Sequence, residues 1–483
     1  MNKDCKNLPS PLLSAIPIVV LVALLYVTIR TFGGDALTGG SQIVLLTSTA
    51  VTSMLAMIFC KVRWEVIERA ICQNILGVST ALIILLLIGA LSGSWMVSGI
   101  VPTMIYYGMQ IIHPNFFLAT SCIICAVVSI MTGSSWTTIA TIGVALMGIG
   151  EAQGFPTGWV AGAIISGAYF GDKVSPLSDT TVLASSVTGA PLFMHIRYMI
   201  YTTVPSLIIT LSIFVFMGFG HTSSDATQIG EYANSLKDTF FISPWLMVVP
   251  LVTAVLIAKK VPSLITLFVS SVMAGLCAVI FQPDLLLQIA GPDVEGGIAL
   301  FKGTFISFYG STSIDTGSAS LNDLVATRGM AGMLNTIWLI ICAMCFGGAM
   351  QASGMLESLT SLFVRFMKRG FGMVTSTVCS GLFLNLVTAD QYISIILTGN
   401  MFKEVYKKNG YDCCLLSRTT EDAVTVTSVL IPWNSCGMTQ STILGVATLT
   451  YLPYCFFNLL SPLMSILVMA LGFKIRRLTN KVE

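Results

Sequence analysis

The stretch GDKVSPLSDTT, residues 171–181, interrupts apolar sequence. WVAGAIISGAYF comes directly before it and VLASSVTGAPLF directly after it. Two aspartates, a lysine and a proline thus stand where a membrane helix would otherwise continue. Proline has no amide donor and disfavours helix at the residue before it. The sequence therefore predicts a helix that unwinds between Ser175 and Asp179 and frees backbone carbonyls there.

The composition indicates a protein embedded in a membrane. Of the 483 residues, 55% are hydrophobic and 10% are charged, against roughly 25% charged in an ordinary soluble domain. Residues 11–26 and 41–60 approach the length of about 20 helical residues that spans a bilayer. The net charge of +2 is scattered over short loops and gives no face for nucleic acid. We expect an all-α polytopic membrane protein whose surroundings are the lipid bilayer.

The basic residues predict the orientation of the chain. With both termini in the cytoplasm and about ten crossings, most of the 24 Lys and Arg residues, Arg418 included, fall on the cytoplasmic side, as the positive-inside rule requires. This count holds only if residues 116–150 and 373–402 do not cross. Each is predicted to be a re-entrant helical hairpin, with its turn at TGSS or TADQ. Polar turns at membrane depth are tolerated where protein buries them or where they line a cavity.

The two hairpins also reveal a repeat. A shift of 256 residues places Ser134 on Asp390, and the same shift places 175–179 on 431–435, a second polar break that contains Pro432. By the loop count, the first unit starts in the cytoplasm near residue 70 and the second starts outside near residue 330. The sequence predicts two inverted-topology repeats, an architecture of secondary transporters.

The predicted organisation has five parts. They are a two-helix segment (1–69), inverted repeat 1 (70–197, with hairpin 116–150 and broken helix 158–194), connecting scaffold helices (198–281), an extracytoplasmic loop (282–330), and inverted repeat 2 (331–483, with hairpin 373–402 and broken helix 414–450). The extracytoplasmic loop is rich in Gly and Ser, which favours a surface connection over a lid.

Acids are expected at membrane depth, where each costs about 2.5–3.5 kcal/mol and so serves a purpose. The predicted embedded acids are Asp172, Asp179, Asp390, Glu421 and Asp422, with Lys173 as the one deep cation. Three structural alternatives stay open. Asp172 with Lys173 makes a neutral pair at a helix break, Asp390 stabilises a turn, and Glu421 and Asp422 form a solvated helix end beside the cytoplasmic boundary.

Oxygen ligands at the breaks suit a small hard cation. We expect Na⁺ at Asp179 and Asp172, with Asp179 the first choice because no basic residue adjoins it, and Asp172 a supporting acid tuned by Lys173. Protons and Na⁺ compete for the same carboxylate oxygens, which couples their opposite fluxes. The predicted ion- and substrate-binding residues are Asp172, Ser175, Ser178, Asp179, Thr180, Thr181, Ser134, Ser135, Asp390, Asn434 and Ser435; the supporting residues are Lys173, Pro176, Pro432 and Trp433.

The sequence lacks the motifs that would indicate another class of protein. No nucleotide-binding glycine loop, metal cluster or nucleophile–base pair accompanies the acids, so neither an enzyme nor a cofactor beyond the transported ions is expected. The C-x-x-C spacings at Cys122 and Cys342 lie inside apolar segments and predict packing. A channel is disfavoured because inverted repeats predict one shared central site.

The motif GAYFGDKVSPLSDTTVLASS resembles the signature of the NhaC-type sodium/proton antiporter family, and NLVTADQYISIILTGNMF and LIPWNSCGMTQSTILGV are similar to that family's second-half motifs. The resemblance spans about residues 10 to 473. It implies an ion-transporter-superfamily fold, a multi-pass protein of the prokaryotic plasma membrane, and exchange of Na⁺ for H⁺ as the activity. By position it assigns Asp172, Ser175, Asp179, Thr180 and Thr181 to the first motif, and Asp390, Trp433, Asn434 and Ser435 to the second.

The resemblance leaves the second substrate open. Some members of the family resemble malate/lactate exchangers and others look like amino-acid carriers. The alternative function is therefore Na⁺-coupled transport or exchange of a small organic acid or amino acid. In that case residues 133–135 and 388–391, at the hairpin tips, would bind the organic group. A homodimer is left open.

Overall fold

The computed structural model describes residues 8–32, 39–219, 226–259, 261–316, 322, 325–365 and 370–478. Part of the expected extracytoplasmic loop (317–321, 323 and 324) and both chain ends, with the basic residues counted there, lie outside the described residues. The described chain is helical, and its only paired extended backbone is two isolated bridges, Thr312 with Thr327 and Tyr411 with Arg477.

The long apolar helices agree with a multi-pass membrane protein. Within the described ranges, eight helices are long and apolar enough to cross a membrane, or up to ten if each of two bent pairs is one span. The predicted all-α polytopic fold is confirmed at this level. The candidate spans are α1 (Pro11–Phe32), α2 (Gly40–Phe59), α3 (Trp64–Val97), α5 (Phe117–Thr132, extended by a 3₁₀ turn η2, Pro114–Phe116), α10 (Leu192–Phe219), α13 (Ser263–Phe281), α17 (Gly329–Ala352) and α19 (Gly370–Thr388). Of these, α5 and α19 are the first arms of the two predicted hairpins, which were expected not to cross.

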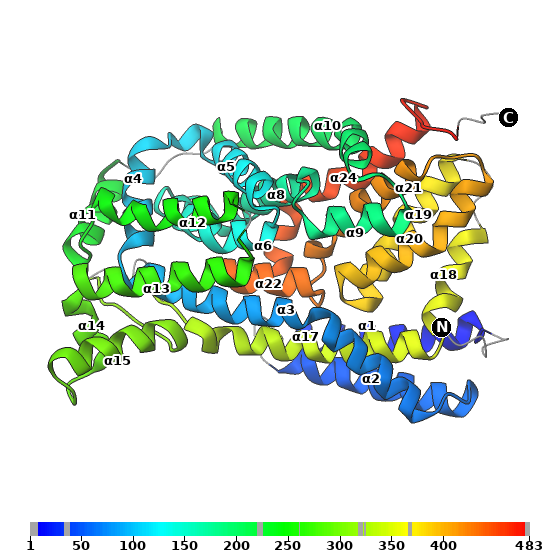
Figure 1. The fold of residues 1–483 in the computed structure, drawn as a ribbon, viewed down its shortest axis with the longest axis horizontal. Coiled ribbons are helices and arrows are strands. Elements are labelled where there is room, and N and C mark those ends of the chain that lie inside the picture. The colour runs from blue at the N-terminus through cyan, green and yellow to red at the C-terminus, as the bar shows by residue number, and fades with distance from the viewer. Residues whose placement is uncertain are drawn as a thin grey trace.

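A layer of long helices forms one side of the molecule. The helices α3 and α17 pack along each other, with α2 and α13 beside them (Figure 1). Small residues allow this close approach, as is common between membrane helices. A Cβ added at Gly93 of α3 would clash with the carbonyl of Ser307, and one at Gly348 of α17 would meet the backbone of Ile71 on α3. Exposed apolar side chains such as Phe268 and Leu276 on α13 fit a face turned to lipid.

The segments between the long spans are mostly helical. Two helices, α14 and α15, lie within the segment expected as a surface loop at 282–330. The helix α15 packs against α14 at Gly303 and against α3 at Ser307. The connecting elements are α4 (Ile100–Ile111), α11 (Ala226–Thr239), η4 (Pro244–Met247), α12 (Val248–Ala258), α14 (Pro283–Ala290) and α15 (Gly296–Tyr309).

Short and interrupted helices lie between the α3–α17 layer and α10 in Figure 1. In the first half these are α6 (Ser135–Thr138), the π-helical turn η3 (Ile139–Gly143), α7 (Val144–Ala152), α8 (Thr157–Val174) and α9 (Asp179–Thr188). In the second half they are α18 (Met355–Arg365), α20 (Gln391–Lys408), α21 (Cys413–Thr420), the π-helical turn η5 (Glu421–Thr425), η6 (Ser428–Leu430), α22 (Ser435–Leu444), α23 (Thr448–Tyr451), η7 (Leu452–Tyr454) and α24 (Phe456–Ala470).

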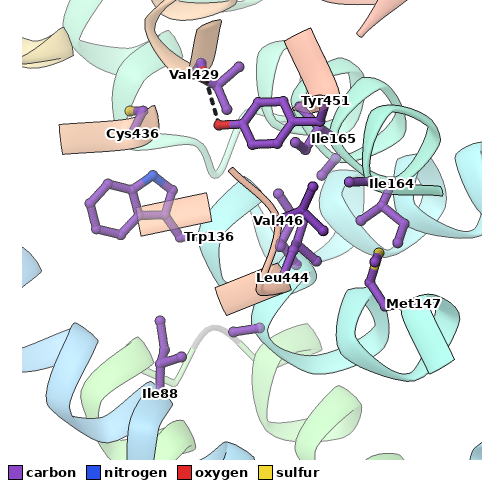
Figure 2. Packing of buried hydrophobic residues seen from close by; sticks show 14 of the residues in the cluster. Ile88, Trp136, Met147, Ile164, Ile165, Val429, Cys436, Leu444, Val446 and Tyr451 are labelled. Atoms are coloured by element: carbon purple, nitrogen blue, oxygen red, sulfur yellow. Dashed lines mark hydrogen bonds between the residues drawn. The ribbon is translucent and has the colours of Figure 1, made fainter. Parts of the chain in front are cut away.

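Apolar side chains of the two halves pack against each other near the interrupted helices. Figure 2 shows Trp136, just after the first hairpin turn, close to Cys436 at the start of α22. In the same cluster the Tyr451 hydroxyl donates to the carbonyl of Val429 at 2.9 Å. Val429 directly precedes the second break, so this hydrogen bond holds one end of the interrupted segment against α23.

Candidate functional site

The first hairpin turns at Gly133, directly after α5 ends. Gly133 has a φ of +67°, in the left-handed region that glycine adopts without a Cβ penalty. Ser134 then caps α6, and its Oγ accepts from the Thr137 amide at 3.2 Å. The Thr132 hydroxyl lies 3.2 Å from both the Ser134 carbonyl and the Thr138 hydroxyl. The polar turn is therefore closed by its own side chains.

The second hairpin closes with the same hydrogen bonds, 256 residues later. Ala389 takes the left-handed position with a φ of +56°. Asp390 caps α20, and its Oδ1 accepts from the Ile393 amide at 3.0 Å. The Thr388 hydroxyl lies 3.0 Å from the Asp390 carbonyl and 2.8 Å from the Ser394 hydroxyl. The two turns thus share one local geometry despite different sequences.

Each hairpin also contacts its own broken helix through corresponding residues. The Ser129 hydroxyl donates to the Ala168 carbonyl at 2.6 Å, and Asn385 Nδ2 donates to the Val424 carbonyl at 2.7 Å. Both pairs differ by the same 256 positions.

The two breaks have helix ends pointing into them. In the first, α8 ends at Val174 and α9 begins after Ser178, whose Oγ accepts from the Thr181 amide at 3.4 Å. In the second, α22 begins after Asn434, whose Oδ1 accepts from the Cys436 amide at 3.1 Å. Helix N-termini carry a positive dipole and free amides, which favour anionic groups nearby.

Hairpin tips touch the breaks directly. A Cβ on Gly133 would lie 2.7 Å from the backbone of Leu177 in the first break. In the second half, the Ala389 carbonyl accepts from the Ser435 amide at 2.8 Å. A movement of either tip therefore displaces the unwound segment beside it.

Asp172 is buried between the first hairpin tip and the first break. Only 4% of its surface is exposed, and its Oδ2 accepts from the Ser135 hydroxyl at 2.7 Å. Among the described residues, its Oδ1 has no hydrogen-bond partner, and the same holds for the buried hydroxyl of Tyr169 one turn earlier. An unpaired carboxylate oxygen beside other buried oxygens is a suitable ligand for a hard cation.

At the position in the second half that corresponds to Asp172, the side chain is neutral. Ser428, which corresponds to Asp172, donates to Gln391 Oε1 at 3.3 Å, and Gln391 corresponds to Ser135. The contact between hairpin tip and broken helix is preserved, but the acid is absent. Within the pair of related contacts, a carboxylate is present only in the first half.

Asp179 lies at the outer end of the first break with an exposed side chain. Its Oδ1 accepts from the Thr180 amide at 2.9 Å, and its Oδ2 accepts from the Tyr392 hydroxyl of the second hairpin at 2.7 Å. Asp179 is close enough to act electrostatically on Asp172. The first break thus has one buried acid, Asp172, and one exposed acid, Asp179.

The hydroxyl groups of the other predicted residues in the first break form hydrogen bonds with nearby groups. Ser175 donates to the Ile130 carbonyl at 2.8 Å, and Thr181 donates to the Lys173 carbonyl at 3.0 Å. The Ser178 and Thr180 hydroxyls lie 2.9 Å apart, next to the acids. Pro176 itself is exposed.

The second break binds its hairpin in a similar way. Ser435 donates to Asp390 Oδ2 at 3.1 Å, so both carboxylate oxygens of Asp390 have partners. Asn434 Nδ2 donates to the Asn385 carbonyl at 3.1 Å, and Trp433 Nε1 donates to the Leu386 carbonyl at 2.8 Å. The turn-stabilising alternative for Asp390 therefore agrees with its contacts.

The sequence pairing of Asp172 with its neighbour Lys173 was wrong. Lys173 Nζ forms an ion pair with Asp422 Oδ1, and both side chains are completely buried. Hydroxyls complete the pair, because Thr202 and Ser461 each donate to Asp422 Oδ1 at 3.1 Å. Successive residues of a helix point to different sides, so Lys173 reaches the second half while Asp172 faces the hairpin.

Arg418 was expected on the cytoplasmic side, and Glu421 was expected at membrane depth, with a solvated helix end as the open alternative. Both residues are 0% exposed, which agrees with a buried Glu421 and contradicts the solvated helix end. The Arg418 guanidinium lies 4.5 Å from the centre of the Tyr198 ring, and its Nε lies 4.0 Å from Asp422 Oδ2. Helical turns run from Cys413 to Leu430 with little interruption, so Arg418 and Glu421 lie inside this helical stretch rather than at its end. The apolar sequence that continues past Asp422 was the available clue.

Membrane spans, two interrupted helices and charged residues buried at the interruptions define a polytopic membrane transport protein. The Na⁺/H⁺ antiporter family model matches residues 167–473, and the chain belongs to this family. The chain is accordingly a multi-pass protein of the prokaryotic plasma membrane, and the predicted relationship to NhaC-type antiporters is confirmed.

Curated relatives cover most of the chain. It is 36% identical to "Na(+)/H(+) antiporter NhaC" of Bacillus subtilis over 84% of this chain and 87% of that protein. It is 37% identical to "Malate-2H(+)/Na(+)-lactate antiporter" of the same organism, over 81% of each chain. It is 32% identical to "Arginine/ornithine antiporter ArcD" of Halobacterium salinarum, over 97% of this chain and 93% of that protein. All three relatives are named as antiporters.

Proposed function

We propose that the protein is a secondary active antiporter that exports Na⁺ in exchange for H⁺ by alternating access. Membership of the Na⁺/H⁺ antiporter family supports this function. The observation that carries it is the buried carboxylate of Asp172, which has one oxygen bonded to Ser135 and one without a partner among the described residues.

The proposed Na⁺ site is built around Asp172. Ser135, Ser178 and the Tyr169 hydroxyl supply further oxygens near it, and Asp179 stands at the exposed end of the same break. The geometry favours Asp172 over Asp179 as the principal ligand, because both oxygens of Asp179 already accept hydrogen bonds. A buried carboxylate without a counter-ion is costly, so an ionised Asp172 needs a bound Na⁺ before the site closes.

The proposed architecture has two inverted-topology repeats with both termini in the cytoplasm, divided at the boundaries expected from the sequence. The hydrogen bonds that recur at a shift of 256 residues support an internal repeat. In such folds the substrate site lies where the two repeats meet. The bond from Tyr392 to Asp179 crosses between the proposed repeats at that place.

The test is transport by the purified protein in liposomes. A pH gradient is imposed, and ²²Na⁺ movement is recorded together with an internal pH dye. Na⁺ uptake that depends on the gradient, and dissipates it, without any organic solute supports antiport. Failure of a pH gradient to move Na⁺ at any ratio of the two ions would remove the proposal.

A second candidate function is exchange of a small organic acid or amino acid coupled to Na⁺. The completely buried Arg418 favours it, because within the described chain none of its guanidinium nitrogens has a hydrogen-bond partner. Guanidinium groups bind carboxylates through paired hydrogen bonds. This candidate requires that malate, lactate, arginine or a related solute be present before Na⁺ moves, and the same liposomes test it.

A further inference from the structure

Glu421 is a second buried acid that the proposed Na⁺ site does not use. It is 0% exposed, and within the described chain neither carboxylate oxygen has a hydrogen-bond partner. No Lys or Arg nitrogen of that part of the chain lies within 4.0 Å of it; Lys173 pairs with the next residue, Asp422. Glu421 is thus a carboxyl group with no direct compensation.

A buried carboxyl group without compensation is more stable in its protonated form than in its ionised form. An ionised carboxylate removed from water costs several kcal/mol unless a cation or several donors compensate it. A protonated carboxyl has a far smaller cost. Burial without a hydrogen-bond partner in the described chain therefore favours the protonated form of Glu421.

The electrostatic surroundings of Glu421 are mixed. Lys173, Asp172 and Asp422 are close enough to act on it. Of the elements packed against η5, α21 contributes Arg418 and α9 contributes Asp179, while α19 and α24 carry no Asp, Glu, Lys, Arg or His. On α20 the charged residues are exposed and Tyr406 is buried; the charged residues are Lys403, Glu404, Lys407 and Lys408.

Glu421 also begins a π-helical turn, a rare element often found at functional sites. Polar groups surround this turn. The hydroxyls of Thr420 and Thr425 are buried without a partner in the described chain, and Asn385 Nδ2 donates to the Val424 carbonyl at 2.7 Å. The Thr425 hydroxyl lies near enough to act on Glu421 but outside hydrogen-bonding geometry. These groups offer a polar setting for proton transfer at a buried helical turn.

We propose that Glu421 is the proton-carrying acid of the exchange, at a site separate from the Na⁺ site at Asp172. This inference rests on the proposed Na⁺/H⁺ antiport. The carboxyl gives its proton to water on one side and takes one from the other, so no further reactant is needed. Loss of the proton leaves a buried negative charge that attracts Lys173. This attraction weakens the ion pair between Lys173 and Asp422. Protonation of Glu421 is thereby coupled to the contact between the two halves.

The test compares proton-coupled and proton-independent Na⁺ movement in the full-length protein. Glu421→Gln mimics the protonated acid without a transferable proton, and Glu404→Gln, on the exposed face of α20, is the matched control. In liposomes, ²²Na⁺ flux driven by a pH gradient is measured first. Exchange of ²²Na⁺ for unlabelled Na⁺ at equal pH, which needs no proton transfer, is measured second.

The expected result is that Glu421→Gln slows pH-driven flux roughly 100-fold, the usual scale for loss of a proton-transfer group, and keeps Na⁺/Na⁺ exchange. Glu404→Gln behaves like the wild type in both assays. Retained pH-driven flux in Glu421→Gln, or equal loss of both activities, would overturn the inference. Wild-type protein that shows no pH-driven Na⁺ flux contradicts the proposed function instead, so the two failures are distinguishable.

A measurement on the wild-type protein covers the case in which Glu421→Gln does not fold. Dicyclohexylcarbodiimide, an apolar reagent, modifies protonated carboxyl groups in apolar surroundings, and peptide mass spectrometry locates the modified residue. Modification of Glu421 together with loss of pH-driven flux is expected. Inhibition with Glu421 unmodified, or modification without loss of flux, would contradict its role.

Discussion

Lys173 of α8 and Asp422 of η5 form a completely buried ion pair across 249 positions of the sequence. The pair joins the first broken helix to the second. Thr202 on α10 and Ser461 on α24 donate to the same carboxylate oxygen, so four elements meet at one atom.

Removing one partner of this pair should destabilise the protein strongly. Lys173→Met leaves the buried Asp422 with its 4.0 Å contact to Arg418 as the one remaining ion pair among the described residues, at an expected cost of about 3–5 kcal/mol, and Lys173→Met with Asp422→Leu should recover most of that loss. Thermal unfolding in detergent measures both, with the exposed Lys237→Met as the control. A double variant no more stable than the single one would show that the pair is not a charge-compensating contact.

The two hairpin turns should respond oppositely to matched substitutions. Gly133→Ala adds a Cβ at a positive φ and against the backbone of Leu177, whereas Ala389→Gly removes one from a position with the same backbone conformation. We expect Gly133→Ala to lower stability by more than about 1 kcal/mol and to weaken Na⁺ affinity, because it shifts the first break. Ala389→Gly should be neutral or stabilising. Thermal unfolding midpoints and the KM for Na⁺ are measured for both variants. Equal effects at both turns would contradict the role given to the contact between Gly133 and Leu177.

Tyr392 should affect transport through Asp179. Tyr392→Phe removes the hydroxyl that lies 2.7 Å from Asp179 Oδ2, a loss of about 1 kcal/mol or roughly fivefold in the KM for Na⁺. Tyr406→Phe on the same helix removes a hydrogen bond to Thr377 and serves as the control, with lower stability but an unchanged KM. An unchanged KM in Tyr392→Phe would separate Asp179 from the ion path.

The local features of this fold were accessible from the sequence. Pro176 and Pro432 lie in breaks between helices, and the turns expected at TGSS and TADQ fall at Gly133 and Ala389. These features depend on neighbouring residues, whose backbone preferences are encoded locally.

The buried charges were not accessible in the same way. Lys173 adjoins Asp172 in sequence but pairs with Asp422, because helix packing decides which side chains meet. Arg418 was assigned to the cytoplasmic side, since a basic residue near a predicted loop usually marks that side, and this left a solvated helix end open for Glu421. Their burial follows from contacts with α10, α19 and α24 that no local pattern encodes. The helices α14 and α15 were likewise missed, because a Gly- and Ser-rich composition favours a loop.

The most direct test of the account is pH-driven ²²Na⁺ flux by Asp172→Asn in liposomes, with Asp293→Asn, an exposed acid, as the control. Asparagine keeps the size of the side chain and the contact with Ser135 but cannot balance the charge of Na⁺. We expect flux at least about 100-fold below wild type for Asp172→Asn, with normal thermal stability and an unaffected control. Wild-type flux in Asp172→Asn would contradict the proposed Na⁺ site at the first break.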